Sequence, residues 1–111
     1  MANRTRQAEF LAQPPFCLTI AGLDPSGGAG ATADLRVFRR VGVYGLSAFT
    51  ALTPQNTRGV IGIHPVSKEA LQEELQAVFS DFPVAAMKTG QIPNRELALV
   101  IAKALEEQKA P

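Results

Sequence analysis

A glycine-rich segment at residues 21–30, AGLDPSGGAG, constrains this chain more than any other stretch. It follows a short apolar run at residues 16–21 and precedes a helical pattern over residues 31–41. In α/β folds such a turn lies at the carboxyl end of a strand, where the next helix begins and presents free backbone N–H groups. Its glycines let the backbone approach a ligand closely. The segment therefore predicts a small-molecule site at one edge of a sheet.

Two common phosphate-binding patterns do not fit this turn. The Walker A pattern has its glycine spacing at Gly22 and Gly27, but Gly28 stands where a lysine is required. The dinucleotide pattern G-x-G-x-x-G starts at Gly28 and Gly30, but Ala33 occupies its third glycine position. The segment is therefore a ligand-facing turn of another kind, or a glycine-rich linker that binds nothing.

The rest of the chain predicts an α/β fold with a mostly parallel sheet and flanking helices, because strand patterns alternate with helical ones. Helices are expected over residues 31–41, after an N-cap at Ser67, and from about Pro93 onward. Residues 1–15 are expected to form a disordered tail, and residues 16–111 the folded, amino-terminal part of a domain. The expected strands are residues 16–21, 46–53, 60–64 and 84–88.

Composition limits the class of partner. The formal net charge is +1 with no long basic run, which gives no reason to expect nucleic acid as a partner. No apolar stretch approaches the length of a membrane span. A single cysteine, Cys17, excludes an internal disulfide and favours a reducing compartment such as the cytoplasm. His64 is the only histidine and has no partner at metal-ligand spacing, so no metal site is expected.

Three polar positions are candidates for ligand contact. Asp34 falls on the face of its helix that packs on the sheet, where a carboxylate must be paired, must cap local N–H groups or must bind a ligand. Gln55 follows a strand at the same sheet edge as the glycine-rich turn, and its amide offers both a donor and an acceptor to a heterocycle. A bond to local backbone would also explain Gln55. Lys88 ends a strand at this edge, where it reaches a phosphate or is simply solvated.

Several motifs together resemble hydroxymethylpyrimidine/phosphomethylpyrimidine kinases, whose fold is ribokinase-like. The similarity runs from about Leu18 to the end of the chain. It implies a kinase of thiamine biosynthesis that uses ATP and Mg²⁺ to phosphorylate 4-amino-5-hydroxymethyl-2-methylpyrimidine and then its monophosphate. The motifs are residues 21–30, Ala33-Asp34-Leu35, residues 42–45, residues 50–60 and Lys88-Thr89-Gly90.

The resemblance also implies roles for particular residues. It assigns pyrimidine contacts to Gly22, Asp34 and Gln55, and places Ala29 and Thr53 in the same pocket. The chain departs from the family pattern at three positions, which are Leu23, Thr32 and Gln91. Gln91 stands where the family has a methionine that packs on the pyrimidine, so the apolar wall of the pocket differs here.

Members of that family are much longer, and this chain ends where a further strand is expected. The resemblance places the ATP site and the catalytic residues in the missing part, so none is assigned here. The sheet is then truncated after about four strands, and its apolar edge is expected to favour a homodimer or pairing with another chain. Two alternatives remain open: a catalytically inactive product that at most binds the pyrimidine, and part of a pyridoxal-type vitamin kinase.

Overall fold

The computed structural model describes residues 14–108 and contains one mixed four-stranded sheet. The strand order is β5-β2-β1-β6. The central strand β1 (Phe16–Leu23) pairs in parallel with β2 (Tyr44–Leu52) and with β6 (Val84–Thr89), whereas β5 (His64–Pro65) is antiparallel to β2. The mostly parallel sheet predicted from the sequence is confirmed. Most of the expected tail, residues 1–13, lies outside the described residues.

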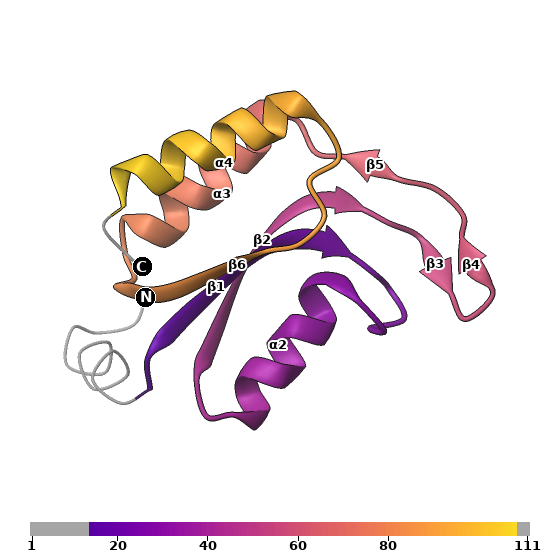
Figure 1. Cartoon of the computed structure of the whole chain (residues 1–111), viewed down its shortest axis with the longest axis horizontal. Coiled ribbons are helices and arrows are strands. Elements are labelled where there is room, and N and C mark those ends of the chain that lie inside the picture. Colours follow the sequence, from indigo (N-terminus) through magenta and orange to yellow (C-terminus); the bar gives the residue numbers. More distant parts are fainter. Residues whose placement is uncertain (1–13, 109–111) are drawn as a thin grey trace.

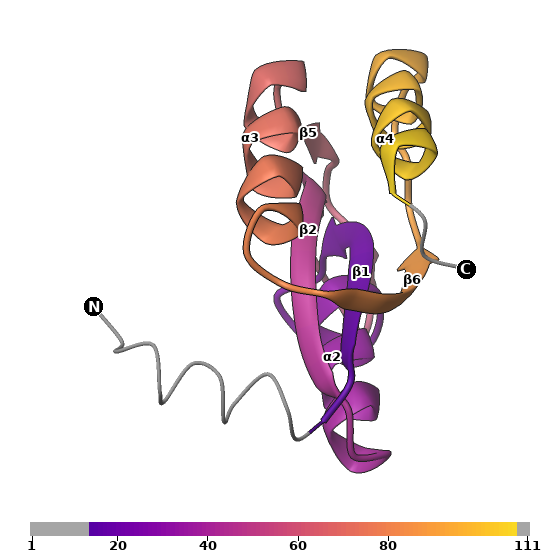
Figure 2. The same ribbon diagram turned by 90° about the vertical axis from the view of Figure 1, so that its left-hand side faces the viewer.

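The helices cover both faces of this sheet, as Figures 1 and 2 show. Helix α2 (Gly30–Arg40) packs on one face, and helices α3 (Lys68–Phe79) and α4 (Arg95–Glu107) lie side by side on the other. The main core lies under α3 and α4, where inward side chains of β1 and β2 meet the apolar stripes of these two helices. Its buried members are Phe16, Leu18, Ile20, Leu46, Ala48, Leu71, Leu75, Leu97, Val100 and Ile101.

Local signals explain where the helices begin and end. The Ser67 hydroxyl accepts a hydrogen bond from the Ala70 N–H at 3.0 Å, so the predicted N-cap of α3 is confirmed. Helix α4 begins at Arg95 behind an Asn94 N-cap, which places Pro93 just before the helix rather than in its first turn. Helix α2 stops at Gly42, which has a φ of +84°, as expected for a glycine that ends a helix.

The expected strand over residues 60–64 is wrong. The structure instead has a short hairpin, in which β3 (Gln55–Asn56) pairs with β4 (Gly59–Val60), and a separate β5 that follows. Asn56 accepts a hydrogen bond from the Arg58 N–H at 2.8 Å, which closes the tight turn. The apolar residues that suggested one strand are exposed; Ile61 is 79% exposed. Apolar residues in a short segment did not here indicate a buried strand face.

The outer edge of β2 is capped by a side chain of α3. Strand β5 pairs only with Ala51 and Leu52, and the Phe49 N–H further back donates to Glu74 Oε1 at 2.8 Å. The second carboxylate oxygen of Glu74 is buried with no hydrogen-bond partner among the described residues. Burial raises the pKa of Glu74, and the Phe49 N–H only partly offsets that effect. A side chain thus replaces the missing strand at this position.

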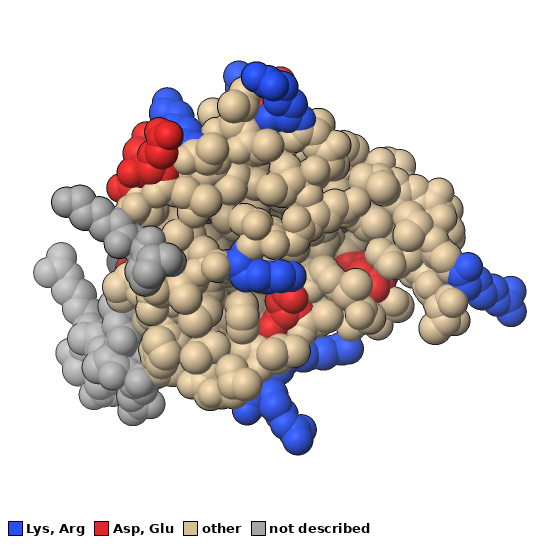
Figure 3. Space-filling model, in the orientation of Figure 1, with Lys and Arg blue, Asp and Glu red and all other residues tan. Residues whose placement is uncertain are grey.

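The opposite edge strand, β6, pairs only with β1 among the described residues. Within residues 14–108 the outer backbone edge of β6 has no strand beside it, in line with the expectation that the sheet exposes an edge. None of the helices within residues 14–108 is long and apolar enough to cross a membrane. On the face shown in Figure 3, Lys and Arg side chains lie at scattered points and form no continuous basic surface.

Candidate functional site

The glycine-rich turn between β1 and α2 is organised by the buried carboxylate of Asp24. One oxygen of Asp24 accepts hydrogen bonds from the Ser26 N–H at 2.8 Å and the Ser26 hydroxyl at 2.7 Å. The other accepts from the N–H groups of Gly28 and Ala29, both at 3.1 Å. The Ser26 hydroxyl has the largest effect on the pKa of Asp24 and, with these N–H groups, holds it below its usual value despite burial.

These contacts bear on one expectation about the turn. The sequence predicted free backbone N–H groups at the start of α2, and two N–H groups just before the helix, those of Gly28 and Ala29, are bound to Asp24. The N–H groups of the first turn of the helix itself begin at Gly30. The part of the turn held by Asp24 is thus a fixed wall beside the helix N-terminus. Thr32, one of the departures from the family pattern, donates its hydroxyl to the Asp24 carbonyl oxygen at 3.0 Å and ties the turn to the helix.

A cavity of about 330 Å³ lies beside this turn, at the carboxyl ends of β1, β2 and β6. That volume suits a small heterocycle, and the place is where parallel α/β sheets bind ligands. Five of the six residues predicted to contact substrate line it; the exception is Asp34. The complete lining is Gly22, Asp24, Ala29, Gly30, Thr53, Gln55, Val60, Ile63, Lys88, Gly90 and Gln91.

Two glutamine side chains in this cavity are bound to the same residue, Thr53. Gln55 Nε2 donates to the Thr53 carbonyl oxygen at 3.2 Å, and the Thr53 hydroxyl donates to Gln91 Oε1 at 3.0 Å. The Gln91 carbonyl oxygen also accepts from the hydroxyl of Thr50, a fully buried residue, at 2.7 Å. The polar groups of this wall are therefore held by hydrogen bonds rather than free to rotate.

Asp34 lies next to the cavity and binds Lys88, which is one of the lining residues. One carboxylate oxygen of Asp34 accepts from Lys88 Nζ at 2.7 Å and from the Thr19 hydroxyl at 2.6 Å. Burial raises the pKa of Asp34, but the hydrogen bonds from Lys88 and Thr19, with the charge of Lys88, lower it overall. Asp34 faces the sheet as predicted from the sequence, and it is paired there. Its contact with a substrate stays a prediction.

For Lys88 the sequence left two possibilities, a phosphate contact or simple solvation, and the structure places this half-exposed side chain in the cavity lining. Its ammonium group is held by Asp34, a residue 54 positions earlier, because Lys88 is in register with Thr19 of β1. The hairpin residues Val60 and Ile63 were not predicted as lining. The turn at residues 56–59 folds the hairpin back and brings these two residues to the site. The polar residues around that turn were the only sign of it in the sequence.

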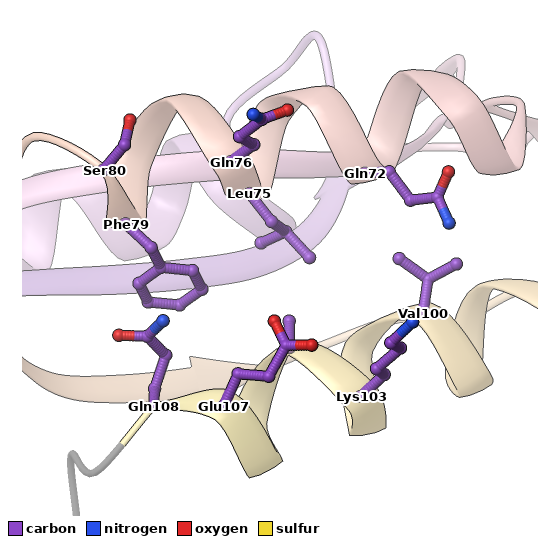
Figure 4. Close-up of a pocket in the computed structure, with 10 residues that line it drawn as sticks. Gln72, Leu75, Gln76, Phe79, Ser80, Val100, Lys103, Glu107 and Gln108 are labelled. Atoms are coloured by element: carbon purple, nitrogen blue, oxygen red, sulfur yellow. The ribbon is translucent and has the colours of Figure 1, made fainter.

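A second hollow, of about 500 Å³, lies between α3 and α4, on the face of the sheet opposite α2 (Figure 4). Apolar side chains, including Leu75, Phe79 and Val100, form its base, and glutamines surround it. It is the groove between two packed helices and includes none of the residues singled out in the sequence. Within residues 14–108, no group of three or more His, Cys, Asp or Glu side chains could hold a metal ion.

Comparison with known proteins identifies this architecture. The solved phosphomethylpyrimidine kinase of Clostridium difficile superposes with a TM-score of 0.84 at 42% identity, over 86% of this chain and 42% of that one. The pyridoxal kinase of Staphylococcus aureus, solved in complex with pyridoxal, superposes with a TM-score of 0.80 at 29% identity, over 88% of this chain and 36% of that one. The fold is thus that of the ribokinase-like kinases.

Sequence comparison narrows the class further. The family model described as phosphomethylpyrimidine kinase matches residues 24–111, so the chain belongs to that family. The hydroxymethylpyrimidine/phosphomethylpyrimidine kinase of Aquifex aeolicus is 45% identical over 94 residues, and that of Rhizobium meliloti is 50% identical over 90 residues. These alignments cover 85% and 81% of this chain but only 37% and 34% of the relatives. The chain therefore spans a minor part of their length.

Proposed function

We propose that this chain carries the pyrimidine-binding part of a kinase of thiamine biosynthesis. The substrate is 4-amino-5-hydroxymethyl-2-methylpyrimidine and then its monophosphate. The observation that carries the proposal is the cavity at the sheet edge, which brings Gly22, Thr53, Gln55 and Gln91 together in a chain of this family. The rigid turn forms one wall, and amide groups with both donors and acceptors form another.

ATP is the proposed phosphoryl donor, with Mg²⁺ as its cofactor. The similar Staphylococcus aureus pyridoxal kinase has been solved with AMP-PCP and pyridoxal, which supports a nucleotide in this class of enzyme. The described residues of this chain offer no cluster for Mg²⁺, so the proposal assigns the ion to no residue here. Phosphoryl transfer needs charge stabilisation around the moving phosphoryl group. We therefore expect the 111-residue chain to bind the pyrimidine without phosphorylating it.

The proposal also covers assembly and location. The open edge of β6 supports pairing with a further strand, and a second copy of the chain would supply one in a homodimer. The single cysteine, Cys17, is unpaired, which fits the cytoplasm as the proposed location. A pyridoxal-type kinase remains the second candidate because the similar solved structures include pyridoxal kinases.

A ligand comparison tests the proposed function. We expect hydroxymethylpyrimidine to raise the melting temperature of the purified chain in a saturable manner, and pyridoxal to raise it less at equal concentration. The variant Asp34→Asn, Gln55→Ala is expected to lose this stabilisation, because Gln55 lines the cavity and Asp34 holds Lys88. Stronger stabilisation by pyridoxal would favour the second candidate. A folded chain that responds to neither ligand would contradict both.

A further inference from the structure

The two glutamines of the cavity are turned in opposite senses by Thr53. Gln55 uses its amide nitrogen to donate to the Thr53 carbonyl oxygen, which leaves Gln55 Oε1 as a free acceptor. Gln91 uses its amide oxygen to accept from the Thr53 hydroxyl, which leaves Gln91 Nε2 as a free donor. Neither remaining group has a hydrogen-bond partner among the described residues. Thr53 thus orients the two glutamines so that Gln55 offers an acceptor and Gln91 offers a donor at the same cavity wall.

The position of Gln91 is set from two further sides. Its backbone carbonyl oxygen accepts from the buried Thr50 hydroxyl at 2.7 Å. Its side-chain oxygen lies against Gly22, where an added Cβ would be 2.6 Å from Gln91 Oε1 and 3.0 Å from the Thr53 hydroxyl oxygen. A Cβ at this position would push Gln91 Oε1 away and disturb the hydrogen-bonded pair of Thr53 and Gln91. Gly22 therefore supports this arrangement as well as lining the cavity.

We propose that Gln91 is a specificity-determining residue that recognises the pyrimidine ring by donating a hydrogen bond from its Nε2 to a ring nitrogen. Gln55 Oε1 then accepts from the exocyclic amino group, so the two amides match a ring that carries an acceptor and an amino donor. This inference rests on the proposed function and adds a hydrogen bond at a position where the family resemblance expects an apolar methionine. A ring without the amino group leaves Gln55 Oε1 without a partner, which disfavours it.

Calorimetric titration of the 111-residue chain with hydroxymethylpyrimidine tests the role of Gln91. The variant Gln91→Met has a side chain of similar length without the amide, and because Gln91 is exposed we expect the variant to fold. Loss of one hydrogen bond to the ring is expected to weaken binding about tenfold. The variant Thr53→Val removes the hydroxyl that orients Gln91 but keeps the carbonyl that holds Gln55, and we expect it to weaken binding severalfold.

A ligand lacking the amino group separates the two amides. Gln91→Met should weaken binding of this analogue by the same factor, because the ring nitrogen is still present. Gln55→Met should weaken binding of the parent pyrimidine and leave binding of the analogue unchanged. If Gln91→Met binds the parent as tightly as the natural sequence does, the inference is wrong while the proposed function stands. If the folded natural chain binds no pyrimidine, both are wrong.

Discussion

Removal of the Asp34 carboxylate is the perturbation whose cost follows most directly from the contacts. Thr19 is fully buried, and its hydroxyl donates to Asp34 Oδ2 at 2.6 Å. In Asp34→Ala this hydroxyl loses its acceptor, and an unpaired buried group of this kind costs about 1–3 kcal/mol. The ion pair with Lys88, whose side chain is 47% exposed, adds about 0–1 kcal/mol because solvent screens it. We expect Asp34→Ala to lower the free energy of unfolding by about 1–4 kcal/mol.

Urea unfolding followed by circular dichroism at pH 7 measures this cost. Lys88→Met is the matched control, since it removes the exposed ion pair and leaves the Thr19 hydrogen bond intact; we expect a loss below about 1 kcal/mol. The double variant Thr19→Val, Asp34→Ala should recover much of the stability that Asp34→Ala loses, because no unpaired hydroxyl remains. Equal losses in Asp34→Ala and Lys88→Met would show that the exposed ion pair, and not the Thr19 hydrogen bond, dominates the cost.

Three further predictions concern the turn, the sheet edge and pH. Glu74→Gln should raise the free energy of unfolding by about 1 kcal/mol at pH 7, since it removes a buried charge and keeps an acceptor for the Phe49 N–H. Because the folded pKa of Glu74 is raised, this gain should shrink as the pH falls through that raised pKa and be absent below pH 4.5, where Glu74 is protonated in both states, as thermal melts at pH 7 and below pH 4.5 would show. Gly30→Ala should cost more than Gly42→Ala in urea unfolding, because both glycines have positive φ but only the Cβ at residue 30 would overlap the Gly22 carbonyl oxygen. The stability that charged Asp34 contributes should be complete above its usual pKa of 3.8 and be lost as pH falls through its lowered folded pKa, so Asp34→Asn should flatten the acid limb of a melting-temperature profile.

Local patterns in the sequence were sufficient to predict much of the fold. The strand, glycine-rich turn and helix at residues 16–41 follow from apolar runs separated by glycines, and the Ser67 cap and its apolar stripe define α3. The segment at residues 60–64 was predicted wrongly because its apolar β-branched residues resemble a strand, whereas pairing across the hairpin decides the structure. Burial depends on neighbours that a local pattern does not contain.

The sequence was sufficient to predict most of the residues proposed to contact the substrate as cavity lining, but not the hydrogen bonds between them. Gln55 and Gly22 were placed at one sheet edge because parallel strands end together. An Asx-type turn was one interpretation of Asp24 before Pro25, and its bond from the Ser26 N–H forms one, but the local sequence did not show that its second oxygen would also bind the Gly28 and Ala29 N–H groups. Likewise the pairing of Asp34 with Lys88 depends on the register of β1 and β6, which join residues far apart in sequence.

An NMR titration of the ¹⁵N-labelled chain with hydroxymethylpyrimidine shows whether the cavity at the sheet edge is the pyrimidine site. At 11.8 kDa the protein is small enough to resolve its side-chain amide signals. We expect saturable shifts of the Gln55 and Gln91 side-chain amides and of the Gly22 backbone N–H, with the glutamines of the groove between α3 and α4 unaffected. Shifts confined to that groove, at Gln72 and Gln76, would exclude the sheet-edge cavity as the pyrimidine site, and so would a folded chain whose spectrum does not change.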